Sequence, residues 1–198
     1  MSSTTLFAML SFSFVMSITP GPVNVMIISS GINHGFKNTF SFISGATIGF
    51  TLLFALIGLG LHSFLNTFPS FFIYLEVLGS SFIIYMGYKI ATSTSSLEQS
   101  KKENKKLRFY EGFLLQWLNP KAWIASVSGV SMFVSGDKTL IIFIFIYFII
   151  CYLSLSFWGI LGDRATTFFS TSKRLKVLNI TMGGLLIFSA VSLLVMNL

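Results

Sequence analysis

Charged residues are scarce in this chain of 198 residues. They make up only 10%, against about 25% in soluble globular domains. Hydrophobic residues reach 54%, and the mean hydropathy is +0.82. The uncharged stretches are residues 1–36, 38–75, 139–162 and 177–198. Each can hold a membrane-spanning helix, which needs about 20 apolar residues. The composition therefore predicts a polytopic membrane protein without a sizeable soluble domain.

Cysteine occurs once, as Cys151. A single cysteine excludes an internal disulfide, a CxxC redox pair and a cysteine-based zinc site. The chain also lacks an HExxH motif, a pair of intramembrane aspartates, a convincing Ser/His/Asp set and a nucleotide-binding P-loop. We therefore expect neither an enzyme nor an ATP-driven pump, and no catalytic residue, cofactor or bound metal.

The hydrophobic pattern predicts an all-α fold of six transmembrane helices in a single domain. The expected spans are residues 4–33, 37–62, 69–91, 109–135, 139–162 and 175–197. The polar stretch 92–108, in which four lysines fall within residues 101–106, is typical of a flexible surface linker.

Lys and Arg residues indicate how these spans are oriented. With six spans, the loops after the first, third and fifth share one side and carry eleven of the thirteen Lys and Arg residues, whereas the opposite side has only Lys138. The positive-inside rule then places linker 92–108 in the cytoplasm and both termini outside the membrane. The net charge of +7 is explained by this asymmetry, so we expect a lipid bilayer rather than nucleic acid as the partner.

An internal duplication is indicated by a shift of one hundred residues. It places Pro20 on Pro120, and YLEVL of residues 74–78 on RLKVL of residues 174–178. The linker then separates repeat 1, residues 1–91, from repeat 2, residues 109–198. Because each half has three spans, the halves would be antiparallel, so the pattern predicts inverted repeats.

The first span is interrupted by Thr19-Pro20-Gly21-Pro22. Proline removes a backbone donor and clashes with the preceding turn, so the helix must unwind here. In lipid, freed backbone groups are tolerated only where they are buried in protein or line a wet cavity. Pro22 can start a new half-helix, whose N-terminus suits a carboxylate, and Asn24 adds a polar side chain. The alternative is a structural kink without a ligand.

The fourth span is interrupted at Asn119-Pro120, and Lys121 follows directly. A cation inside a span costs about 2.5–3.5 kcal/mol on insertion scales. Lys121 is therefore a candidate partner for a substrate carboxylate or for exposed carbonyls, the alternative being that it snorkels to an interface. Breaks at matching positions of two half-chains point to the substrate site of a transporter. The predicted site comprises Thr19, Pro20, Gly21, Pro22, Asn24, Gln116, Asn119, Pro120 and Lys121.

Two acids are candidates for coupling or gating. Glu76 is the only carboxylate clearly inside a predicted span and could carry a coupling proton, although a place near the outer interface fits as well. Asp163 falls at the cytoplasmic end of the fifth span and Glu111 at the same face of the fourth. Asp163 and Glu111 are each expected to be a loop charge or a member of a gate salt bridge.

Three segments together resemble the lysine-exporter (LysE/RhtB) family of bacterial amino-acid exporters. They are ITPGPVNVMIISSGINHGFKNTFSFISGATIGF (18–50), LEVLGSSFIIYMGYKI (75–90) and GFLLQWLNPKAWIASVS (112–128). The resemblance implies secondary export of amino acids or similar small metabolites, coupled to the proton gradient. It also implies a six-span fold in the bacterial inner membrane, often as a homodimer. The chain departs from the family at Phe50, where many members carry an aspartate.

Two other functions stay open. An ion or metal transporter of related fold would need several oxygen ligands for a hard cation, and the single embedded Glu76 is a poor supply. A non-transporting membrane scaffold protein would use the two breaks only to kink its helices.

Overall fold

The computed structural model describes residues 2–61, 71–92, 107–169 and 171–197, and all regular structure within them is helical. The α-helices are α1 (Ser3–Ile18), α2 (Pro22–His34), α3 (Phe36–Leu56), α5 (Phe71–Ala91), α6 (Phe109–Trp117), α7 (Pro120–Phe133), α8 (Asp137–Ala165) and α9 (Ser172–Asn197). Two short helical turns, η1 (Ile57–Leu61) and η2 (Thr166–Phe169), extend α3 and α8. These bounds agree with the predicted spans to within a few residues.

Several of these helices are long and apolar enough to cross a membrane. Among the described residues they are Phe36–Gly60, Asp137–Phe168 and Lys173–Ser192, and α1 and α2 qualify together as one span bent by 60°. The count includes neither α5 nor the pair α6 and α7. The protein is thus an all-helical, multi-pass membrane protein.

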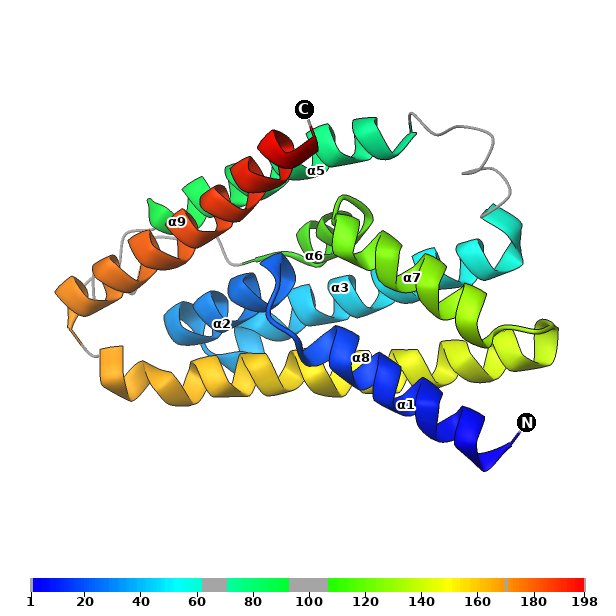
Figure 1. Cartoon of the computed structure of the whole chain (residues 1–198). Coiled ribbons are helices and arrows are strands. Elements are labelled where there is room, and N and C mark those ends of the chain that lie inside the picture. Colours follow the sequence, from blue (N-terminus) through cyan, green and yellow to red (C-terminus); the bar gives the residue numbers. More distant parts are fainter. Residues whose placement is uncertain (1, 62–70, 93–106, 170, 198) are drawn as a thin grey trace.

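One order of elements occurs twice along the chain. A broken pair, a long helix and a further helix appear first as α1–α2, α3 and α5, and again as α6–α7, α8 and α9. Helix α8 packs on α1, α2 and α3, and α3 also packs on α6. Helices α5 and α9 lie side by side as a pair next to this group (Figure 1).

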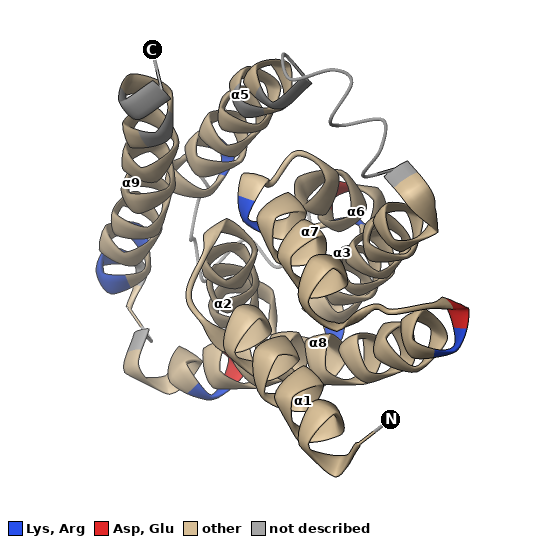
Figure 2. Ribbon diagram, turned by 45° about the vertical axis from the view of Figure 1, so that its right-hand side comes forward, with Lys and Arg blue, Asp and Glu red and all other residues tan. Residues whose placement is uncertain are grey.

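Charged residues lie mostly at the ends of helices (Figure 2). The ends of α2, α5 and α8 and the starts of α3 and α9 gather at one end of the molecule, on the left in Figure 1. These termini carry Lys37, Lys89, Arg164, Lys173, Arg174 and Lys176. The start of α8, at the opposite end, carries Asp137 and Lys138. We call the first end the basic end.

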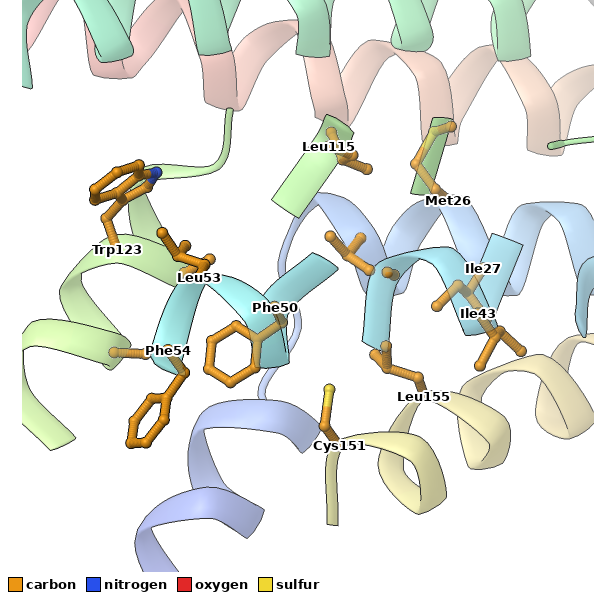
Figure 3. Close-up of a cluster of buried hydrophobic side chains, with 14 of the residues drawn as sticks. Met26, Ile27, Ile43, Phe50, Leu53, Phe54, Leu115, Trp123, Cys151 and Leu155 are labelled. Carbon is orange, nitrogen blue, oxygen red and sulfur yellow. The ribbon is translucent and has the colours of Figure 1, made fainter. Parts of the chain in front are cut away.

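An aromatic cluster forms the centre of the core. It consists of Phe50 and Phe54 of α3 and Phe143 and Tyr147 of α8, whose ring centroids lie 4.5–5.7 Å apart in the closest pairs. Figure 3 shows Phe50 and Phe54 on α3, with Cys151 and Leu155 on α8. Because lipid tails are as apolar as these side chains, the cluster stabilises the fold through close packing rather than through escape from water.

Glycines bring the helix backbones into contact. A Cβ atom at Gly45 of α3 would overlap the backbone of Phe109, and one at Gly112 of α6 would overlap the carbonyl of Phe42. Such small residues are typical of helix contacts in membranes. Close packing of α3 on α6 is therefore sufficient to explain Gly45.

We expect Gly45→Ala to destabilise the protein. The added methyl must displace the backbone of α6, and overpacking of this kind costs about 1–3 kcal/mol. A lower melting temperature in detergent and a lower abundance in the membrane would be measured. Gly184→Ala is the matched control, because a Cβ there meets nothing within 4 Å. Equal melting temperatures for the two variants would contradict the expectation.

Candidate functional site

Both predicted helix breaks are present. Helix α1 ends at Ile18 and α2 starts with Pro22, while α6 ends at Trp117 and α7 starts with Pro120. The two helix-starting prolines are thus Pro22 and Pro120. The repeat alignment had matched Pro120 with Pro20, which instead lies in the link between α1 and α2.

Lys121 connects the two breaks. Its Nζ donates a hydrogen bond to the carbonyl of Thr19, at 2.7 Å, and its backbone N–H donates to Oδ1 of Asn119, which caps α7, at 3.2 Å. The cation therefore reaches across to the first break. Thr19 contacts Lys121 through its backbone carbonyl. Its side-chain hydroxyl donates instead to the carbonyl of Val15.

Other freed carbonyls also find donors, as burial in a membrane requires. At the first break, Asn24 Nδ2 donates to the carbonyl of Ser17 at 3.0 Å, and the Trp158 indole donates to that of Ile18 at 3.1 Å. At the second break, the Trp123 indole donates to the carbonyl of Trp117 at 2.7 Å. Trp123 is buried, and its indole hydrogen bond closes the second break.

A cavity of about 40 Å³ lies between the breaks. It is lined by Met16, Ser17, Gly21, Val23, Asn24, Phe50, Gln116, Asn119, Lys121, Ala122, Ala125, Tyr147, Cys151 and Leu155. This volume has room for about three waters, whereas ligand pockets measure about 300–1,000 Å³. The site is therefore contracted in this conformation and must widen to admit an amino acid.

Five of the predicted site residues meet in this cavity, namely Gly21, Asn24, Gln116, Asn119 and Lys121. Thr19 lies next to it through the hydrogen bond from Lys121. Pro20, Pro22 and Pro120 are not among the lining residues. They shape the backbone, since Pro22 and Pro120 begin the two half-helices and Pro20 keeps the link unwound.

Sequence reasoning missed the wall opposite the breaks, which is made of Phe50, Tyr147 and Cys151. Phe50 had been noted only as a departure from the family pattern. Tyr147 and Cys151 are four residues apart, so they share one face of α8, and Cys151 is the middle residue of that 29-residue helix. This spacing was the one available signal for a polar face halfway along α8.

Of the two acids proposed for coupling or gating, Asp163 does not line the cavity. Asp163 is exposed at the basic end of α8, about 18 Å along the helix from Cys151 at 1.5 Å per residue. Glu76 belongs to α5, but its side chain lies outside the described part of the chain. The same is true of most of the predicted linker 92–108, whose residues 93–106 are not described.

A second polar group, which we call the end cluster, joins four helices near the basic end. Lys89 of α5 forms an ion pair with the buried Glu111 of α6. Asn33 of α2 and Asn179 of α9 exchange side-chain hydrogen bonds of 2.8 and 3.2 Å. A second cavity of about 40 Å³ is bordered by Asn33 and Lys89. The ion pair expected for Glu111 as one alternative is thus present.

Comparison with known proteins places this geometry in context. The model of a family described as LysE type translocator matches residues 14–197, a range that includes every cavity-lining residue. Two cysteine/O-acetylserine efflux proteins, from Escherichia coli (strain K12) and Shigella sonnei (strain Ss046), are each 29% identical over 134 residues, which is 68% of this chain and 68% of each relative. No solved structure matches the chain.

Proposed function

Since the chain belongs to the LysE type translocator family, we propose that it is a secondary transporter that exports amino acids or similar small metabolites from the cell. It is a membrane transporter and not an enzyme. The observation that carries the proposal is the cavity in which the Lys121 cation and the amide side chains of Asn24, Gln116 and Asn119 converge from both helix breaks.

The substrate carboxylate is proposed to bind at Lys121 and at the start of α2. The first backbone hydrogen bond of this helix runs from Val25 N–H to the carbonyl of Gly21, so the preceding N–H groups of the helix start are available to an anion. Lys121 already holds one carbonyl at 2.7 Å. Because an ammonium has three donors, it can contact a carboxylate while keeping this bond.

The proposed transport cycle uses two inverted three-helix repeats of six spans in the bacterial inner membrane. The doubled order of elements supports the repeats, and the cations of the basic end support a cytoplasmic linker with both termini outside. Rocking of the repeats would open the contracted cavity to one side at a time. The end cluster would close the cytoplasmic side, together with Asp163.

Energy is proposed to come from the proton gradient, with Glu76 as a candidate carrier of the coupling proton. A homodimer is proposed from the family resemblance, and cross-linking in native membranes tests it. A metal transporter gains no support, because the described residues contain no group of three or more His, Cys, Asp or Glu side chains that could hold an ion.

Export should be measurable in cells loaded with amino acids through a dipeptide mixture. We expect overexpression to speed the appearance of at least one amino acid in the medium severalfold over cells with an empty vector, and a proton uncoupler to abolish the gain. If none of the twenty amino acids leaves faster, the export proposal fails and the scaffold alternative is favoured. Uncoupler-insensitive export would remove only the proton coupling.

A further inference from the structure

The charge of the cavity lining is one-sided. Among the described residues that line it, Lys121 is the only charged one and none carries a carboxylate. Glu111 is engaged by Lys89 in the end cluster, and Asp137 and Asp163 lie exposed near the two ends of α8. A bound substrate therefore meets a fixed positive charge without a fixed negative one.

We infer that the site accepts α-amino acids whose side chain is uncharged and rejects those with a cationic side chain. The inference rests on the proposed function and adds the substrate class. Three regions of the cavity carry it: a cation for the carboxylate, neutral acceptors for the ammonium, and an aromatic wall for the side chain.

A carboxylate and an ammonium can be held together beside Gly21. A Cβ atom at Gly21 would lie 3.4 Å from Cδ and 3.5 Å from Nζ of Lys121, and 3.9 Å from Oδ1 of Asn24. Since Asn24 turns its Nδ2 toward the carbonyl of Ser17, its Oδ1 is left to accept another hydrogen bond. A donor for an anion and an acceptor for a cation thus border one point, as the two charged groups of an α-amino acid require.

Gln116 supplies a second uncharged acceptor. Its side chain is only 6% exposed, lines the cavity, and makes no hydrogen bond to another residue in the described ranges. Its amide oxygen is therefore left to accept a hydrogen bond from a ligand group in the cavity. An amide oxygen can accept from an ammonium but does not cancel its charge as a carboxylate would.

The remaining wall consists of Phe50, Tyr147 and Cys151. It suits a small apolar or weakly polar side chain. A lysine or arginine side chain placed here would add a second cation to a site that already contains Lys121. No carboxylate among the described lining residues would offset the repulsion. Rejection of basic amino acids follows from this like-charge contact.

Exchange in liposomes tests the inference with the purified full-length protein. Liposomes are loaded separately with L-serine, L-cysteine, L-leucine, L-phenylalanine, L-lysine or L-arginine, and entry of the same labelled amino acid is followed. We expect at least one uncharged amino acid to exchange ten times faster than in protein-free liposomes. Lysine and arginine should stay within about twofold of that background.

Two variants of one residue make the test sharper. Gln116→Glu adds a carboxylate of nearly the same shape and should raise lysine exchange at least fivefold, whereas Gln116→Leu should slow uncharged exchange without admitting lysine. Melting temperatures within a few degrees of the parent would show that both variants are folded.

The outcomes separate the two proposals. Lysine exchange as fast as that of the best uncharged amino acid would overturn the inference and leave the exporter intact. A folded Gln116→Glu variant that gains no lysine exchange would also overturn it. If the folded parent exchanges none of the six, the proposed function falls, and the inference with it.

Discussion

Replacing Lys121 by methionine is expected to lower the initial rate of export at least about tenfold. The change removes the only charge among the described residues of the cavity lining but keeps an unbranched side chain of similar length. A hydrogen bond to a charged group is worth about 1.5–3 kcal/mol, and 1.4 kcal/mol is a factor of ten in an equilibrium constant. The rate would be measured in loaded cells and normalised to the amount of protein in the membrane.

Lys121 also contributes to the fold, because its Nζ donates a hydrogen bond to the carbonyl of Thr19 at 2.7 Å. A melting temperature is therefore needed beside the rate. Lys121→Arg keeps the charge and should retain part of the export, mainly with a raised KM, because the guanidinium differs in shape from the ammonium. Lys138→Met makes the same substitution at an exposed position near the start of α8 and should leave export within about twofold of the parent.

Export by Lys121→Met at the parental rate would remove this residue from the substrate site. If Lys121→Met melts at the parental temperature but exports poorly, Lys121 takes part in substrate binding. If the variant melts at a lower temperature but keeps the parental KM, Lys121 serves to close the first break. Lower melting stability with a normal KM would thus indicate that the Lys121–Thr19 hydrogen bond stabilises the fold.

The breaks and their polar residues could be predicted because their physics is local. A proline at Pro22 or Pro120 cannot donate into a helix wherever the chain folds, and a cation such as Lys121 is costly in lipid without a partner. The uncharged stretches likewise predict helix bounds, because a helix in lipid must satisfy all of its own backbone groups.

The aromatic wall could not be predicted in the same way. Phe50 is buried beside the cavity, whereas Phe145 of α8 is 64% exposed on the outer surface, although both lie in equally apolar stretches. In a membrane, apolar side chains suit both places, so hydrophobicity does not tell the lipid face from the interior. The Asn33–Asn179 pair was hidden for another reason, since 146 residues separate its members.

The prolines of the two breaks occupy different positions relative to their helices. Identity matched Pro120 with Pro20, but the helix start favours a proline at the first helical position, which Pro22 occupies. The caps then differ, with Gly21 before α2 and Asn119 before α7. The two breaks therefore differ in their capping residues.

Removing the ion pair of the end cluster should open the basic end of the protein. Glu111 accepts from Lys89 and from the backbone N–H of Arg108, at 2.8 Å for the latter, so it ties α5 to the start of α6. Glu111→Gln weakens two hydrogen bonds to a charged group, each worth about 1.5–3 kcal/mol. The open form should then become at least tenfold more populated, and export should fall because closure is impaired.

Accessibility of Ser29, a buried residue that lines the second cavity, can report this opening. A Ser29→Cys reporter in a Cys151→Ser background would be treated with a membrane-impermeant maleimide in inside-out vesicles. We expect labelling to be at least fivefold faster with Glu111→Gln than without it. Exchanging the charges, with Lys89→Glu and Glu111→Lys together, restores an ion pair and should slow the labelling again. An unchanged labelling rate in Glu111→Gln would mean that the Lys89–Glu111 ion pair holds α5 against α6 without closing the cytoplasmic side. Closure would then have to depend on Asn33 and Asn179.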